Sequence, residues 1–242
     1  MRKMLLLFGI YLLFLSSFTS CEKNLIEYKQ GDLKIRVEKG ENWLHDFPLF
    51  LGIDKKNPPQ IAIWTEDKDS NYLSTIYVSY KTAHQAWQSA GKSRRKEALP
   101  YWSHKRGVIY EDGLYMPTKK NPLAYGVTGA TPTGSFNLKV TPAKSSQHFL
   151  VFVEINHSTD FNDNYPKSAK EGNANYSGGK EGSGQPALVY CADVDLSTGK
   201  TSFEANLIGH SSPDGTNGNL YSDVSDMSSA LHIVKHITIN LQ

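Results

Sequence analysis

The sequence predicts an all-β protein with a β-sandwich fold, one or two short helices and a long glycine-rich loop. Most segments with an ordered pattern are short, rich in β-branched and aromatic residues, and bounded by Gly, Pro, Asn or Asp. Aromatic residues are plentiful, with 13 Tyr, 10 Phe and 4 Trp, and they favour a core of β type. The segment 32–242 has the length of one large β-domain, so we expect a single domain whose two sheets share a core.

Strand patterns recur from residue 33 to residue 241. The segment 33–37 alternates apolar and polar residues with a period of two, which indicates one buried and one exposed face. Further strands are predicted at 61–64, 73–80, 135–140, 149–155, 187–196 and 231–241. A turn over 67–71 joins the first two of these strands as a hairpin.

Helical patterns are few. Short helices are predicted at 82–90 and 93–99, the second ended by Pro100 because proline disrupts a helix interior. The segment 160–185 contains five glycines and almost no aliphatic residues, so we expect a long mobile loop there.

The first 20 residues have the pattern of an export signal. Arg2 and Lys3 supply a positive start, an apolar run follows over 4–15, and small polar residues lead to Cys21. The apolar run is shorter than the roughly 20 residues needed to span a bilayer. We therefore expect a cleaved signal peptide over 1–20.

The segment 18–21 reads Phe-Thr-Ser-Cys and resembles a bacterial lipobox, although Leu is more usual than Phe at the first position. The resemblance implies that Cys21 is lipid-modified and begins a tether over 21–31. Acyl chains would then attach the protein to the membrane, on the periplasmic face or at the outer-membrane surface.

Charge and cysteine content exclude several functions. The net charge of +2 gives no global electrostatic basis for binding nucleic acid. The chain has two cysteines, and lipidation would consume Cys21. Cys191 lies in an apolar run over 187–194, which favours an inert buried thiol.

The segment 125–131 reads Tyr-Gly-Val-Thr-Gly-Ala-Thr. It resembles the flavinylation motif of bacterial extracytoplasmic electron carriers, in which a threonine carries FMN through a phosphoester bond. The resemblance implies Thr131 as the attachment residue, although Tyr125 stands where the motif has an acid and Pro132 follows at once. A glycine-rich turn leading into the next strand is the other interpretation. The remaining motif residues are Thr128, Gly129 and Ala130.

Residues 92–106 combine six Lys or Arg with Tyr101 and Trp102. Cations beside flat rings can hold a phosphate and stack a flavin or a sugar, so both aromatic residues are candidates for contact with a cofactor ring. Long basic side chains also commonly cover a surface with no ligand present. Both interpretations stay open.

A longer series of short motifs includes the same segment around Thr131. The pattern Pro-x-x-Ala-x-Trp-x-Glu-Asp at 59–67 precedes a segment rich in Trp and Arg, the Gly-Ala-Thr-Pro turn at 129–132, and a strand ending in Val-Glu near Asn-His at 153–157. Over 58–242 this order resembles the DUF2271 family of bacterial exported proteins. The resemblance implies an immunoglobulin-like sandwich, with an FMN transferase or envelope redox and iron-uptake components as partners.

Two loops offer hard oxygen ligands of the kind that calcium prefers. One contains Asp160, Asn162 and Asp163, and the other contains Asp214 with nearby asparagines. Neither loop has the closing glutamate of an EF-hand. Turn chemistry accounts for Asp, Asn and Gly in these loops equally well.

No complete catalytic motif appears in the sequence. Glu154 and His157 could form an acid–base pair, but no nucleophile is identifiable beside them. We therefore expect a non-enzymatic, lipid-anchored envelope protein that acts as a binding or redox-accessory module, with a covalent FMN carrier as its sharpest form. The alternatives are an interaction or glycan-binding lipoprotein and a calcium-stabilised structural sandwich.

Overall fold

The computed structural model describes residues 25–26, 33–48, 54–87, 94–123, 127–141 and 147–242. The predicted signal peptide, Cys21 and most of the tether therefore lie outside the described residues. Within the described part, no helix is long and apolar enough to cross a bilayer.

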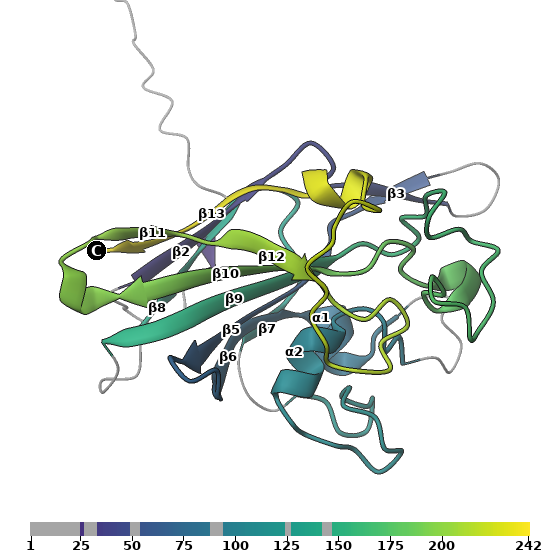
Figure 1. Cartoon of the computed structure of the whole chain (residues 1–242), viewed down its shortest axis with the longest axis horizontal. Helices are drawn as coiled ribbons and strands as arrows, with labels where there is room; N and C mark the ends of the chain where they lie inside the picture. Colours follow the sequence, from purple (N-terminus) through teal and green to yellow (C-terminus); the bar gives the residue numbers. More distant parts are fainter. Residues whose placement is uncertain (1–24, 27–32, 49–53, 88–93, 124–126, 142–146) are drawn as a thin grey trace, which may run out of the picture.

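Two sheets pack face to face, which confirms the predicted all-β sandwich (Figure 1). In spatial order, the six-stranded sheet consists of β12 (Asn206–His210), β10 (Leu188–Asp195), β9 (His148–Asn156), β5 (Gln60–Asp67), β6 (Tyr72–Ser79) and β7 (Val127–Gly129). The five-stranded sheet consists of β1 (Leu25–Ile26), β8 (Phe136–Val140), β2 (Leu33–Lys39), β13 (Val234–Leu241) and β11 (Ser202–Glu204). A separate hairpin pairs β3 (His45–Pro48) with β4 (Asp54–Asn57).

The main core lies between the two sheets. Leu33, Ile35 and Val37 of β2 alternate inward, as the period of two predicts, and Val153 and Ile155 of β9 belong to the same cluster. A fully buried aliphatic side chain contributes about 1.5–3 kcal/mol through removal of its surface from water. This core fixes the register of both sheets, because a slip of one residue would turn each apolar set toward solvent.

A second apolar cluster covers the outer face of the six-stranded sheet. Trp64 of β5 stacks on Phe152 of β9 with ring centroids 5.1 Å apart, and Trp102 packs into the same cluster. Two short helices lie on this side of the sheet, α1 (Tyr80–His84) and α2 (Pro100–Lys105) (Figure 1). The central strands are therefore buried on both faces.

The helix prediction for 93–99 was wrong, because the described residues 94–99 form no helix. The structure begins α2 at Pro100, where the sequence analysis ended a helix, because proline lacks an N–H that the first turn of a helix leaves unbonded anyway. The first predicted helix, 82–90, overlaps α1, which ends at His84, and residues 88–90 lie outside the described residues. The described residues also include three short 3₁₀ segments: η1 (Gly179–Glu181), η2 (Leu196–Thr198) and η3 (Ser229–His232).

The predicted glycine-rich loop is present, and hydrogen bonds tie it to the rest of the domain. The backbone N–H of Asp160 donates to Ser183, and Ser183 and Gln185 are buried. Gly184 has a φ of +80°, and a Cβ there would lie 2.3 Å from the carbonyl oxygen of Asp160, so only glycine fits. The two ends of the loop are consequently pinned side by side.

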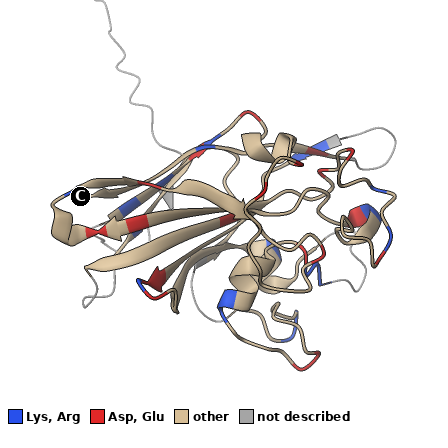
Figure 2. Cartoon of the chain, in the orientation of Figure 1, with Lys and Arg blue, Asp and Glu red and all other residues tan. Residues whose placement is uncertain are grey.

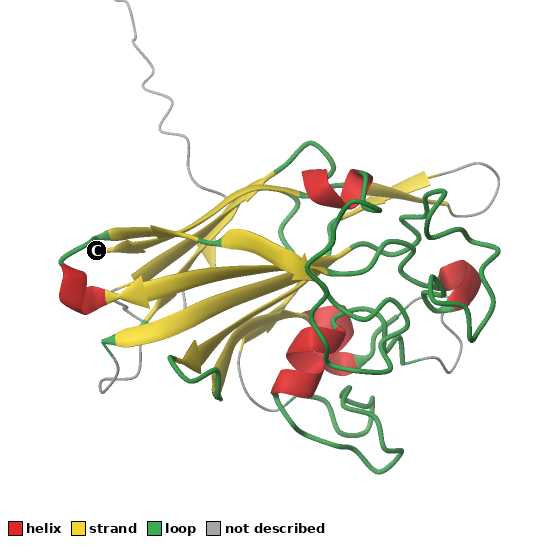
Figure 3. Cartoon of the chain, in the orientation of Figure 1, coloured by secondary structure: helices red, strands yellow, loops and turns green. Residues whose placement is uncertain are grey.

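The long loops gather at one end of the sandwich, where β5 begins and β9 ends (Figure 3). Lys, Arg, Asp and Glu are scattered over the described loops and strands (Figure 2). The clefts described below and many of the buried polar groups lie at this end.

Candidate functional site

A cleft opens at the loop end between the β3–β4 hairpin, α1 and the segment after β9. Its lining includes His45 and Phe47 of β3, Lys81 of α1, Trp87 and Arg95. The cleft is narrow, with a volume of about 30 Å³ between these side chains, which is room for a water molecule or a small ion.

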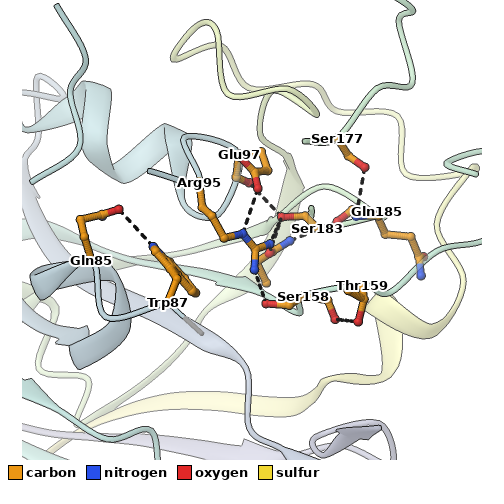
Figure 4. A network of polar contacts seen from close by, with 11 residues as sticks. Gln85, Trp87, Arg95, Glu97, Ser158, Thr159, Ser177, Ser183 and Gln185 are labelled. Atoms are coloured by element: carbon orange, nitrogen blue, oxygen red, sulfur yellow. Dashed lines mark hydrogen bonds and ion pairs between the residues drawn. The ribbon is translucent and has the colours of Figure 1, made fainter. Parts of the chain in front are cut away.

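Arg95 is the centre of the polar network beside this cleft (Figure 4). Its guanidinium donates to Glu97 at 2.9 Å and to the hydroxyl groups of Ser158 at 2.6 Å and Ser183 at 3.4 Å. The same group lies over the ring of Trp87, 4.8 Å from the ring centroid. Arg95 and Glu97 are nearly fully buried, so their charges neutralise each other and cross-link three loops.

The backbone around the cleft is held in strained conformations. Four non-glycine residues have a positive φ among those described, and three of them border this network: Gln85, Arg95 and Thr159. Such a conformation costs about 1–3 kcal/mol and persists only where surrounding contacts hold it. The Gln85 side chain accepts from Trp87 Nε1 and donates to the backbone of Thr82, which fixes this corner of the cleft.

Lys81 is the unbalanced charge of the cleft. Its side chain is half-buried, and its ammonium has no hydrogen bond or ion pair within the part of the chain that the structure describes. Burial, together with the neighbouring charges of Lys55 and Arg95, lowers the pKa of Lys81. A bound anion would relieve both effects.

Gln60, the first residue of β5, supplies a second unsatisfied group. Only 5% of Gln60 is exposed, and its Oε1 atom has no hydrogen-bond partner among the described residues. A buried acceptor without a donor costs about 1–3 kcal/mol. Gln60 borders the cleft, but its Oε1 atom is itself shielded from solvent, so this group belongs to the packing beneath the cleft.

The imidazoles of His45 and His157 form one wall, with ring centroids 5.2 Å apart. His157 Nε2 donates to the carbonyl oxygen of Asn42 at 2.8 Å. Burial lowers the pKa of His157 to about 4, so this ring is neutral at physiological pH. The acid–base pair considered for Glu154 and His157 is not formed, because the Glu154 carboxyl group instead accepts the backbone N–H groups of Tyr101 and Trp102.

A second cleft adjoins the first and contains two of the predicted flavin-motif residues. Ala130 and Thr131 line it together with Lys81. Thr131 is only 8% exposed, and its hydroxyl lies 2.9 Å from that of Ser79. The Thr131 hydroxyl is thus held in a hydrogen bond rather than presented on an open turn.

The other motif residues belong to the sheet or lie outside the described part. Thr128 and Gly129 are in β7, and the carbonyl oxygen of Gly129 accepts from the Tyr77 hydroxyl at 3.1 Å. Tyr125 lies outside the described residues. The segment leading to Thr131 is therefore partly an edge strand, whereas the alternative interpretation of the motif predicted a glycine-rich turn.

Tyr101 and Trp102 are placed in the core. Trp102 is fully buried, and its Nε1 atom donates to the hydroxyl of Thr75 at 2.9 Å. Neither ring lines either of the two clefts. Of the nearby cations, Arg94 pairs with Asp112, and Lys105 pairs with Glu66 at 3.0 Å. The basic and aromatic segment thus serves mainly to cover the outer face of the sheet.

The candidate calcium ligands do not form a cluster. Asp160 is buried and accepts from the Ser229 hydroxyl, while the carbonyl oxygen of the Asn162 side chain accepts from the backbone N–H of Tyr165. Burial raises the pKa of Asp160. Among the described residues, no group of three or more His, Cys, Asp or Glu side chains is arranged to hold a metal ion. Asp163 therefore belongs to no such group.

Cys191 is half-buried on β10. Burial raises the pKa of this thiol to about 12, which keeps it protonated at neutral pH. A redox role for Cys191 therefore has no support in its surroundings.

No family model, curated protein or solved structure matches this chain. The chemistry of the two clefts is consequently the basis for a functional proposal.

Proposed function

We propose that this protein is a lipid-anchored, non-enzymatic binding module of the cell envelope that takes an anionic small molecule at Lys81. The observation that carries the proposal is the half-buried ammonium of Lys81, which has no counter-charge among the described residues and lies near Lys55 and Arg95. Arg95 is already neutralised by Glu97, so Lys81 is the cation left to pair with a ligand. A carboxylate or phosphate supplies the missing counter-charge.

The expected affinity is modest. A hydrogen bond to a charged group contributes about 1.5–3 kcal/mol, and the flanking rings of Phe47 and Trp87 add apolar contact. These terms together correspond to dissociation constants on the order of micromolar to millimolar. Such values suit capture of an abundant envelope metabolite or polymer.

Calorimetric titration of the purified exported protein with inorganic phosphate and with glucuronate tests the proposal, with glucose as the neutral comparison. Lys81→Met should weaken binding of both anions at least about tenfold, which corresponds to 1.4 kcal/mol. Lys56→Met is the matched control, because Lys56 has the same charge but is exposed and pairs with Asp46. Equal affinity of wild type and Lys81→Met would refute the assignment.

The pH dependence has a defined sign. Anion binding needs the protonated amine, so affinity should fall as the pH rises through the pKa of Lys81. Burial lowers that pKa below the ordinary 10.5, so the loss begins at a lower pH than for an exposed lysine. The bound anion opposes this shift by favouring the charged amine.

A covalent FMN carrier is the second candidate, and one observation favours it. Thr131 and Lys81 line the same cleft, so a phosphoester on Thr131 would lie beside an ammonium group. Attachment requires the Thr131 hydroxyl to leave its hydrogen bond with Ser79. The partners in this case are an FMN transferase and envelope redox or iron-uptake components.

Intact mass after co-export with an FMN transferase tests this second candidate. A carrier gains the mass of one FMN, and Thr131→Ala abolishes the gain while Thr128→Ala retains it. An unmodified wild-type mass would exclude the carrier and leave the anion-binding proposal untouched. Membrane release of a Cys21→Ser variant tests the proposed lipid anchor in the same preparations.

A further inference from the structure

The second cleft is the roomier of the two described above, with a volume of about 200 Å³. Lys81 lines it, so the ammonium that lacks a counter-charge among the described residues is available there. Pro58, Ala130 and the half-exposed Tyr80 supply carbon surface around it. Walls of this kind favour a ligand with an apolar part over a bare inorganic ion.

A pair of hydroxyl groups belongs to the same cleft. Ser79 and Thr131 both line it, and their hydroxyl oxygens lie 2.9 Å apart. Ser79 Oγ also accepts from the backbone N–H of Ile61 at 2.7 Å and donates to the carbonyl oxygen of Ile61 at 3.2 Å. The pair is thereby tied to the backbone of β5.

The bonds to Ile61 determine the direction of the hydrogen bond between the two hydroxyl groups. A serine has a single O–H donor, and Ser79 uses it on the carbonyl oxygen of Ile61. Thr131 is therefore the donor toward Ser79. Its proton is committed in this way, and its Oγ1 atom accepts no hydrogen bond from any described residue. A ligand that contacts Thr131 Oγ1 must consequently donate a hydrogen bond.

The two polar groups of the cleft thus need opposite partners. Lys81 needs an anion, and Thr131 Oγ1 needs a hydrogen-bond donor. A simple carboxylate or sulfate supplies only the anion. A 2-hydroxy acid carries a carboxylate and an O–H donor on neighbouring carbon atoms, and its short carbon chain suits the apolar walls.

We propose that the ligand is a small 2-hydroxycarboxylic acid, with its carboxylate on Lys81, its hydroxyl group donating to Thr131 Oγ1 and its carbon chain against the apolar wall of the second cleft. This inference rests on the proposed anion-binding function. It adds the class of anion, and it assigns Thr131 as the residue that determines specificity.

Calorimetric titration with matched acids tests the inference. Lactate should bind at least about tenfold more tightly than propionate, which lacks the hydroxyl group, and than 2-methoxypropionate, which keeps the oxygen but has no donor. Phosphate has an O–H donor but no carbon chain, so it should bind more weakly than lactate. Equal affinity for lactate and propionate, or phosphate binding at least as tightly as lactate, would overturn the inference.

Substitution of Thr131 locates the preference for the hydroxyl group. Thr131→Val should abolish the preference for lactate over propionate and leave propionate binding unchanged, which also shows that the variant is folded. Thr131→Ser keeps the acceptor and should retain the preference. Thr128→Val is the matched control, because Thr128 lies in β7 and lines neither cleft. A preference that survives Thr131→Val would also overturn the inference.

The outcomes distinguish the two proposals. Lys81-dependent binding of lactate and propionate with equal affinity would remove the hydroxy acid as ligand and retain the anion site. Absence of Lys81-dependent binding for every anion would remove both.

Discussion

The two ends of the sandwich are built in opposite ways. At the far end, β5 and β6 are joined by a tight turn in which the Asp67 carboxylate accepts the backbone N–H groups of Asp69 and Asn71. Asp195 caps η2 in the same manner by accepting from Ser197. At the loop end, Arg95 binds hydroxyl groups that are 63 and 88 residues away in sequence.

The far end connects the strands by local turns, whereas the loop end offers groups that can contact a ligand. The polar groups of the local turns at the far end already form hydrogen bonds within each turn, so few of them can bind a ligand. The loop end holds strained backbone, a lysine with no counter-charge among the described residues and an unsatisfied acceptor, because its loops are stabilised by contacts between distant segments. Both clefts lie at this end.

Breaking the buried ion pair between Arg95 and Glu97 should lower the free energy of unfolding more than any other change proposed below. Arg95→Met leaves Glu97 buried without its cation, and the loss of one partner of a buried pair costs about 3–5 kcal/mol of unfolding free energy. Urea unfolding measures it.

The far end provides the control for that experiment. Lys68→Met removes a cation from an exposed pair with Asp69 and should leave stability unchanged within error. The double variant Arg95→Met/Glu97→Leu should regain part of the loss, since it leaves no buried charge. A single Arg95→Met variant as stable as the wild type would show that the network does not hold the loops.

Glu154 holds α2 to the sheet by accepting two of its backbone N–H groups. Its removal should lower stability by a smaller amount that depends on pH. Glu154 is fully buried, and burial raises its pKa to about 8, against the opposing backbone N–H groups of Trp102 and Tyr101. The folded state therefore retains a proton that the unfolded chain loses above pH 4.5, so this group makes stability fall as the pH rises toward 8.

Glu154→Gln should cost about 1–3 kcal/mol, because one backbone N–H of α2 loses its acceptor. It should also flatten the decline in stability between pH 6.5 and 8. That window excludes His157, whose lowered pKa of about 4 affects stability only between that value and 6.5. An unchanged slope in urea unfolding over this window would contradict the assignment.

The turn at the far end should show the smallest effect. Asp67→Ala removes an exposed carboxylate that accepts from Asn71, and the melting temperature should fall by less than for the two variants above. These hydrogen bonds lower the pKa of Asp67, so its contribution is present above the ordinary value of 3.8 and is lost as the pH falls through the lowered one. Asp69→Ala, which keeps the backbone donor, is the control in calorimetric melts.

The sequence predicted what local pattern determines. The alternation in β2, the hairpin around Asp67 and the long strands β9 and β10 all follow from period-two burial and turn residues. The start of α2 was misplaced, because Pro100 is compatible with both the end and the beginning of a helix.

The cleft was less predictable. Lys81 and Gln60 carry no local signal, since a single lysine or glutamine becomes distinctive only when distant loops bury it without a partner. The motif around Thr131 did point to a residue of the second cleft. Tyr101 and Trp102 were predicted as ligand contacts from local composition. Composition does not reveal that both side chains pack in the apolar cluster on the outer face of the six-stranded sheet.

The pairing of β2 with β13 also determines the order in which the chain can fold. Val37 in β2 lies opposite Ile237 in β13, about 200 residues later, so the centre of the five-stranded sheet stays open until β13 has been synthesised. Folding dominated by such distant pairings is slow and exposes apolar strand faces in the meantime. A chain interrupted before β13 would retain an unpaired edge on β2, and it should aggregate rather than persist as a partial sandwich.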